Sequence, residues 1–228
     1  MEAFSQWFSQ LEWGKLIEAV ISAGACLLCI VIHELCHGLA ALWMGDDTAR
    51  RSGRLTMNPL KHVDLVGLVL LITVHFGWAK PVPVNMRKFR RPKLGMVLTS
   101  LAGPLGNFII ALFMTPAYAA SLVWFQISGS FAVYYLAVFL LMSITVSIGL
   151  MVFNLIPIPP LDGSKVLFSV LPSQWYRKLM RYERYGMIVL VVLLYLGVLD
   201  VPLSSLRNGI QQFIFTLAGD PVVRLLIG

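Results

Sequence analysis

The chain has 228 residues, of which 58% are hydrophobic and only 13% are charged. Soluble domains have about 45–50% apolar and about 25% charged residues, so this composition excludes an ordinary soluble domain and predicts an integral membrane protein. The net charge of +7 comes from basic residues in short loops between apolar segments. That distribution favours membrane orientation over nucleic-acid binding, and we expect no nucleic-acid partner. The length suits one membrane-embedded domain over 1–228.

A spanning helix needs about 20 mostly apolar residues, and the first part of the chain offers three such segments. They are 16–45, 94–115 and 130–156. The last two belong to a stretch, 94–161, without any Lys, Arg, Asp, Glu or His. Pro116 and the Ser-Gly-Ser cluster at 128–130 predict the turn between them. We therefore expect an all-α polytopic membrane protein.

The C-terminal part carries one or two additional membrane segments. Residues 186–203 are apolar for long enough to form a span, and they follow a polar, basic stretch around 172–185. The apolar piece at 209–219 is shorter, and the sequence leaves open whether it crosses the membrane.

Lys and Arg in short loops mark the cytoplasmic side of a membrane protein. The basic loops at 50–61, 80–93 and 177–184 are therefore predicted to be cytoplasmic in a multi-pass protein of the cytoplasmic membrane, and the uncharged turn at 116–130 faces the other side. The apolar piece at 65–76 has basic flanks on both sides, so a single crossing does not fit. We expect a re-entrant or β-hairpin element over about 65–85.

The first predicted span contains the sequence HELCH at 33–37. Charged groups in hydrocarbon are costly, so an acid and two imidazoles in this segment need a reason. On a helix, His33 and His37 share one face and lie about 6 Å apart along the axis. Two imidazoles so placed can bind one zinc ion, and Glu34 at the edge of that face can reach a water molecule beside the metal.

A catalytic zinc site usually has three protein ligands and one open position. The uncharged run ends in NLIPIPPLDG at 154–163, where Asp162 is the first ionisable group. Three prolines forbid a regular helix there, and irregular backbone at membrane depth indicates a protein-lined or wet cavity. The residues alone leave two alternatives open for Asp162: a metal ligand, or a solvated residue in a helix-ending turn.

The motifs together resemble the site-2 protease family of intramembrane zinc metalloproteases. HELCH (33–37), NLIPIPPLDG (154–163) and SLAGPLGN (100–107) match that family. GRLTMNPLKHVD (53–64) and GWAKPVPVN (77–85) resemble its compact bacterial or archaeal branch, which has no PDZ or CBS domain. HExxH alone occurs in many metalloproteases, but its combination with NxxPxxPLDG in a membrane protein is highly specific.

This resemblance implies a three-helix catalytic core formed by the three predicted spans, with one Zn²⁺ ion bound by His33, His37 and Asp162. It also implies that zinc-activated water, with Glu34 as general base and later as proton donor, hydrolyses peptide bonds in or near transmembrane segments of membrane-protein substrates. Asn154 is then expected near the site, where its amide would hold substrate backbone. The alternative is that Asn154 caps its own helix end.

The partners expected from this resemblance are transmembrane protein substrates and the lipid bilayer, and a homo-oligomer stays open. A transmembrane helix must unwind locally before it can be cut. The 65–76 element and the extended segment with Pro83, Val84 and Asn85 are candidates for holding it as an added β-strand. Two alternative functions are an inactive relative that binds membrane segments and a metal transporter. Glu34 argues against both, because neither needs a base beside the metal.

Overall fold

The structure, a computed structural model, describes residues 12–65, 67, 79–171 and 183–227. Every regular element within these ranges is helical, which confirms the all-α prediction for them. Four helical segments are long and apolar enough to span a membrane: Trp13–Trp43, Pro92–Ser128, Phe131–Asn154 and Asp200–Ile227. The protein is therefore a membrane protein with four candidate spans in the part of the chain that the structure describes.

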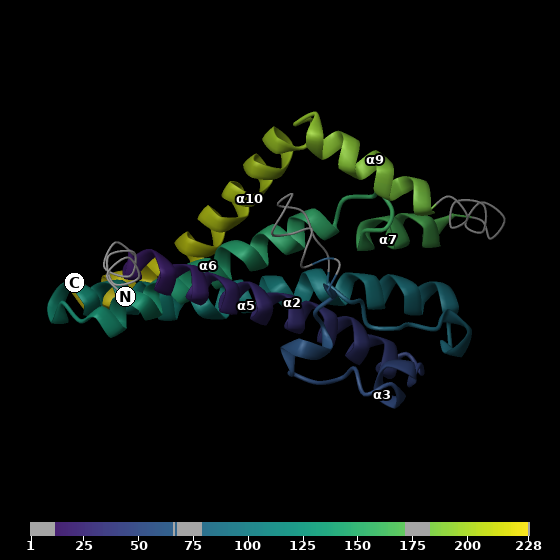
Figure 1. Ribbon diagram of the computed structural model, residues 1–228, viewed down its shortest axis with the longest axis horizontal. Helices are drawn as coiled ribbons and strands as arrows, with labels where there is room; N and C mark the ends of the chain where they lie inside the picture. Colours follow the sequence, from purple (N-terminus) through teal and green to yellow (C-terminus); the bar gives the residue numbers. More distant parts are fainter. Residues whose placement is uncertain (1–11, 66, 68–78, 172–182, 228) are drawn as a thin grey trace, which may run out of the picture.

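Helices α2 (Trp13–Trp43), α5 (Pro92–Ser128) and α6 (Phe131–Asn154) form a bundle in which each helix packs against the other two. Figure 1 shows all three along the long axis of the molecule. The core between α5 and α6 includes Ala111, Ile144, Ile148 and Met151. Small residues on α5 let the helices approach closely, as is usual where packing rather than water drives helix association.

Helix α5 is longer than predicted, because it continues through Pro116 to Ser128. The turn falls at Gly129, inside the predicted Ser-Gly-Ser cluster, and the φ of +60° at this residue is the left-handed conformation that commonly ends a helix. Beside Pro116, the Thr115 hydroxyl donates to the Ala111 carbonyl at 2.7 Å. Proline is tolerated inside membrane helices, where neighbouring helices pack against the interrupted turn, so the part of the turn prediction that rests on Pro116 was wrong.

Residues 186–203 do not form the predicted single span, because the chain bends sharply within this range. Helix α9 (Glu183–Tyr195) ends before Gly197, which has a φ of +68°, and α10 (Asp200–Ile214) starts a new direction. The two helices meet at an apex in Figure 1. The π-helical turn η3 (Phe215–Gly219) and α11 (Asp220–Ile227) continue α10, so 209–219 belongs to the fourth candidate span.

The predicted β-hairpin is not found in the described part of 65–85. An isolated antiparallel bridge joins Val63 to Ala79, and 66 and 68–78 lie outside the described residues. Residues 80–85 are described but form no strand. Pro81 and Pro83 lack the N–H groups that a continuous ladder requires, which explains this difference.

Short elements complete the ends of the bundle. Helix α3 (Thr48–Arg51) and the 3₁₀ turns η1 (Pro59–Lys61) and η2 (Met86–Lys88) connect α2 to α5. Residues 155–161 are irregular, as their prolines predicted, and lead from α6 into α7 (Asp162–Val170), which packs against α5. This irregular turn brings the first residue of α7 back towards the bundle.

Candidate metal centre

His33 and His37 lie one turn apart on α2 and face α5. Their side chains are buried, with 6% and 8% of the residue surface exposed, and their Nε2 atoms are 3.0 Å apart. The ring centroids are separated by 4.6 Å with the rings nearly perpendicular. The helix therefore directs both Nε2 atoms towards one point, as the i, i+4 spacing predicts.

Asp162 completes this group from the start of α7. Its Oδ2 lies 3.3 Å from Nε2 of His33 and 3.0 Å from Nε2 of His37, and the residue is 7% exposed. Burial alone would raise the pKa of this carboxyl, but the neighbouring imidazoles and the Lys165 ammonium outweigh it, so the pKa is lowered. Asp162 is thus a carboxylate directed at the histidines, as a ligand would be.

The three side chains fit a zinc ion. A tetrahedral zinc with bonds of about 2.0–2.1 Å spaces its ligand atoms about 3.3 Å apart. The three donor atoms here form a triangle with sides of 3.0, 3.0 and 3.3 Å. Within the described residues, these two imidazole nitrogens and one carboxylate oxygen form a candidate metal-binding group. Three protein ligands leave a fourth position open, which is typical of catalytic zinc.

Helix α5 orients the two histidines in two ways: one of its backbone carbonyls bonds to His37, and one of its glycines leaves space for both rings. The Thr99 carbonyl lies 2.7 Å from Nδ1 of His37, so Nδ1 carries the proton and Nε2 is free to bind a metal. At Gly103, a Cβ atom would overlap Nε2 of His37 and approach Cε1 of His33 to 2.7 Å. The motif at 100–107 therefore provides the space that the two imidazoles occupy.

Glu34 is held by the segment that precedes α5. Its Oε2 accepts a hydrogen bond of 2.7 Å from the backbone N–H of Val82. The Val82 side chain is buried and lies against Gly38, one turn further along α2. The structure thus brings the segment with the PVPVN sequence onto the HExxH helix, a contact that no side-chain pattern in the sequence indicates.

The residues predicted to bind substrate have local partners. The Asn154 side-chain nitrogen donates to the Leu150 carbonyl, one turn back in the same helix, at 2.9 Å. Asn85 accepts from the Arg87 N–H at 3.0 Å, and its own N–H donates to Asp46. Pro83 is exposed, whereas Val84 packs against the small core around Phe89. Substrate binding by these four residues stays a prediction.

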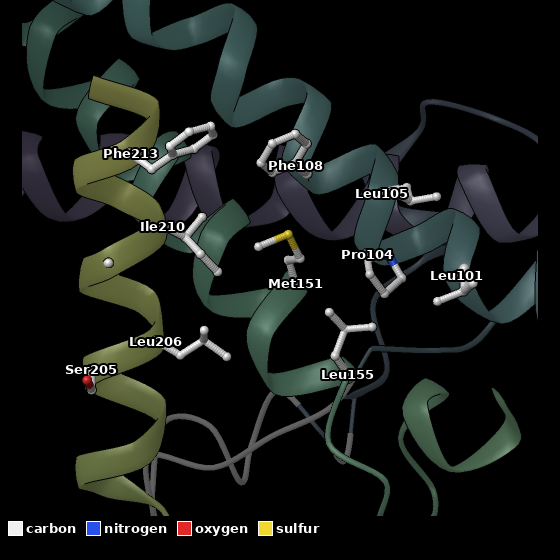
Figure 2. A pocket seen from close by; sticks show the side chains of 11 residues that line it. Leu101, Pro104, Leu105, Phe108, Met151, Leu155, Ser205, Leu206, Ile210 and Phe213 are labelled. Atoms are coloured by element: carbon white, nitrogen blue, oxygen red, sulfur yellow. The ribbon is translucent and has the colours of Figure 1, made fainter. Parts of the chain in front are cut away.

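An apolar cavity of about 660 Å³ lies between α5, α6 and α10 (Figure 2). Pro104 and Phe108 of α5, Met151 and Leu155 of α6, and Ile210 of α10 face it. Pro104 and Leu155 directly follow Gly103 and Asn154 in the chain. Because no ionisable side chain lines it, the cavity suits apolar groups.

A helical protein with four candidate spans and a buried His-His-Asp group has the architecture of a membrane metalloenzyme. Residues 22–198 match the model of peptidase family M50. The chain is 39% identical over 173 residues to "Putative zinc metalloprotease YwhC" of Bacillus subtilis (strain 168), with 73% of this chain and 76% of that protein covered.

Two mycobacterial proteins named "Putative zinc metalloprotease Rip2" are also similar. The one from Mycolicibacterium smegmatis is 30% identical over 172 residues, which cover 74% of this chain and 64% of that protein. The one from Mycobacterium tuberculosis (strain H37Rv) is 27% identical over 222 residues, covering 92% and 82%. No solved structure matches the chain significantly. The chain belongs to peptidase family M50, the site-2 protease family of zinc metalloproteases.

Proposed function

We propose that this protein is an intramembrane zinc endopeptidase that hydrolyses peptide bonds in or near transmembrane segments of other membrane proteins. The observation that carries the proposal is the buried His33–His37–Asp162 group, with Glu34 beside it, on a helix that can span the membrane. An acid and two imidazoles are costly in such a helix, and a shared metal site offsets that cost.

His33, His37 and Asp162 would hold a zinc ion, which would supply Lewis acidity and lower the pKa of a bound water towards about 7. Glu34 takes a proton from that water and later gives it to the leaving amine. Because the Val82 N–H occupies Oε2 of Glu34, Oε1 is the atom available for proton transfer. The burial of His33, His37 and Asp162 excludes bulk water, which strengthens their interactions with charge in the transition state.

The substrate must expose a backbone carbonyl, so its transmembrane helix has to unwind near the site. Pro83, Val84 and Asn85 follow Val82 directly, and in this proposal they hold the unwound segment as an added strand. Asn154 completes the substrate contacts when its amide turns from the Leu150 carbonyl to the substrate backbone. In this proposal the apolar cavity between α5, α6 and α10 takes apolar side chains of the same substrate.

A comparison of wild type with Glu34→Gln tests the proposal. The variant keeps the shape of the side chain and the three metal ligands but removes the base. We expect wild-type membranes to accumulate fragments of membrane proteins that are absent with Glu34→Gln, while both purified proteins contain zinc. If the variant cuts equally well, Glu34 is not the base. If zinc-loaded wild type produces no fragments, the chain is a binder or transporter instead.

A further inference from the structure

Residues 80–85 cross α2 as an extended segment, which we call the strap. Residues that precede proline are biased towards extended conformations, and this applies to both Lys80 and Val82. The strap lies on α2 through Val82, whose N–H donates to Glu34 at 2.7 Å and whose buried side chain contacts the Gly38 position. At its far end, the Asn85 N–H donates to the fully buried Asp46 at 2.5 Å.

Arg54 holds the other side of the strap. Its Nη2 donates to the Lys80 carbonyl at 2.6 Å and to the Pro81 carbonyl at 3.2 Å. Only 9% of the Arg54 surface is exposed, so the guanidinium is largely removed from water, and Nη2 makes both of these bonds. By contrast, the side chain of Arg51 is 76% exposed and pairs with Asp47.

The Arg54 and Glu34 contacts meet on one peptide group. The carbonyl of Pro81 and the N–H of Val82 belong to the same planar unit, whose C=O and N–H point in opposite directions. A guanidinium on its oxygen and a carboxylate on its nitrogen polarise that unit in the same sense, and hydrogen bonds in such chains strengthen one another. Arg54 therefore both fixes this peptide in place and strengthens its bond to Glu34.

We propose that Arg54 is a positioning residue for Glu34, acting through the Pro81–Val82 peptide. The peptide N–H holds Oε2, which directs Oε1 of Glu34 to the water that it deprotonates. This inference rests on the proposed function, in which Glu34 is the base. It predicts that loss of Arg54 slows the chemical step without removing the metal.

The experiment compares Arg54→Met, Arg54→Lys and the matched control Arg51→Met, from the same loop, in full-length purified protein. It measures kcat and KM separately on a membrane-protein substrate that wild type cuts, together with zinc per chain. We expect Arg54→Met to lower kcat by about 10- to 100-fold, the size of one lost charge-assisted hydrogen bond, with KM within about twofold and zinc retained. Arg54→Lys should recover part of kcat, because an ammonium can still donate to one carbonyl. Arg51→Met should resemble wild type.

Equal kcat values for Arg54→Met and Arg51→Met would overturn the inference. A change in KM alone would also overturn it, because Arg54 would then act only on the substrate contacts of the strap and not on Glu34. If Arg54→Met does not fold, Arg54→Lys decides: full zinc with a reduced kcat supports the inference, and loss of zinc contradicts it. Cleavage by wild type reports on the proposed function, whereas the ratio of the two methionine variants reports on Arg54.

Discussion

Gly103 shows how one missing side chain makes room for the metal ligands. A Cβ atom at this position would overlap the His37 ring and press on the His33 ring. The His37 ring cannot move aside easily, since its Nδ1 is hydrogen-bonded to the Thr99 carbonyl. The rings cannot give way without changing the triangle of ligand atoms, so Gly103 is required by space and not by backbone conformation.

Gly103→Ala should therefore impair zinc binding and stability together. We expect zinc affinity to fall at least about tenfold, and overpacking to cost about 1–3 kcal/mol of folding free energy. Metal analysis and thermal unfolding in detergent measure the two effects. Gly24→Ala is the matched control, because nothing lies within 4 Å of an added Cβ at Gly24 on α2. If the two variants keep equal zinc, the space at Gly103 does not matter for the site.

The sequence predicts the side chains of the site better than their backbone partners. The i, i+4 spacing places His33 and His37 on one face, and the proline-rich turn places Asp162 near a bend. The Thr99 carbonyl and the Val82 N–H, however, carry no residue-specific signal, because every non-proline residue has the same backbone groups. Only the folded backbone reveals which of them face His37 and Glu34.

At the scale of elements, the turn between α6 and α7 carries the third ligand to the site. It contains three prolines and ends at Asp162, followed by Gly163. A Cβ atom at Gly163 would overlap the backbone carbonyl of Leu155 at the start of the same turn. The two ends of the turn can approach this closely only because residue 163 has no side chain. The glycine of the PLDG sequence thus sets the position of Asp162.

Gly163→Ala is expected to displace Asp162 and lower zinc affinity while the α2 histidines stay in place. Backbone atoms cannot move aside as a flexible side chain can, so we expect a loss of at least about tenfold in affinity, as for the loss of a ligand contact. Titration with Co²⁺, followed by its absorption spectrum, reports both affinity and ligand geometry. Gly149→Ala on α6 has open space around it and is the control. An unchanged cobalt spectrum in Gly163→Ala would contradict this role of the turn.

The lengths of apolar runs predict two of the long helices well, but they do not predict where a helix bends or continues through a proline. Long apolar runs gave α2 and α6 nearly to their ends. Pro116 did not end the helix because a membrane helix can continue through proline, and the bend at Gly197 was missed because it lies within an apolar run. Both errors arise because apolar content predicts burial in lipid but not the direction of the chain.

At the scale of the whole molecule, the basic loops predict the orientation in the membrane. The loops around α3 and around the strap carry many Lys and Arg residues, whereas the turn at Gly129 is uncharged. The basic loops connect the end of α2 to the start of α5, whereas the uncharged turn connects the end of α5 to the start of α6. If the positive loops face the cytoplasm, the strap and the candidate metal centre lie towards the cytoplasmic half of the bundle.

Cysteine labelling tests this orientation. Ser52 and Ser128 are both exposed and lie in the basic loop and at the uncharged turn, respectively. In intact cells, a membrane-impermeant thiol reagent should label Ser128→Cys but not Ser52→Cys, and permeabilised cells should label both. The natural Cys26, Cys29 and Cys36 lie within α2, and the unsubstituted protein measures their background. Labelling of Ser52→Cys in intact cells would show the reverse orientation.

The zinc content of the purified protein tests the central claim most directly. Protein purified gently in detergent, without chelators, should contain one zinc ion per chain. Asp162→Ala and His37→Ala should each lose most of it, because removal of one of three ligands leaves too few to hold the metal. Metal-free wild type, or full zinc content in both variants, would contradict the assignment of His33, His37 and Asp162 as the metal centre.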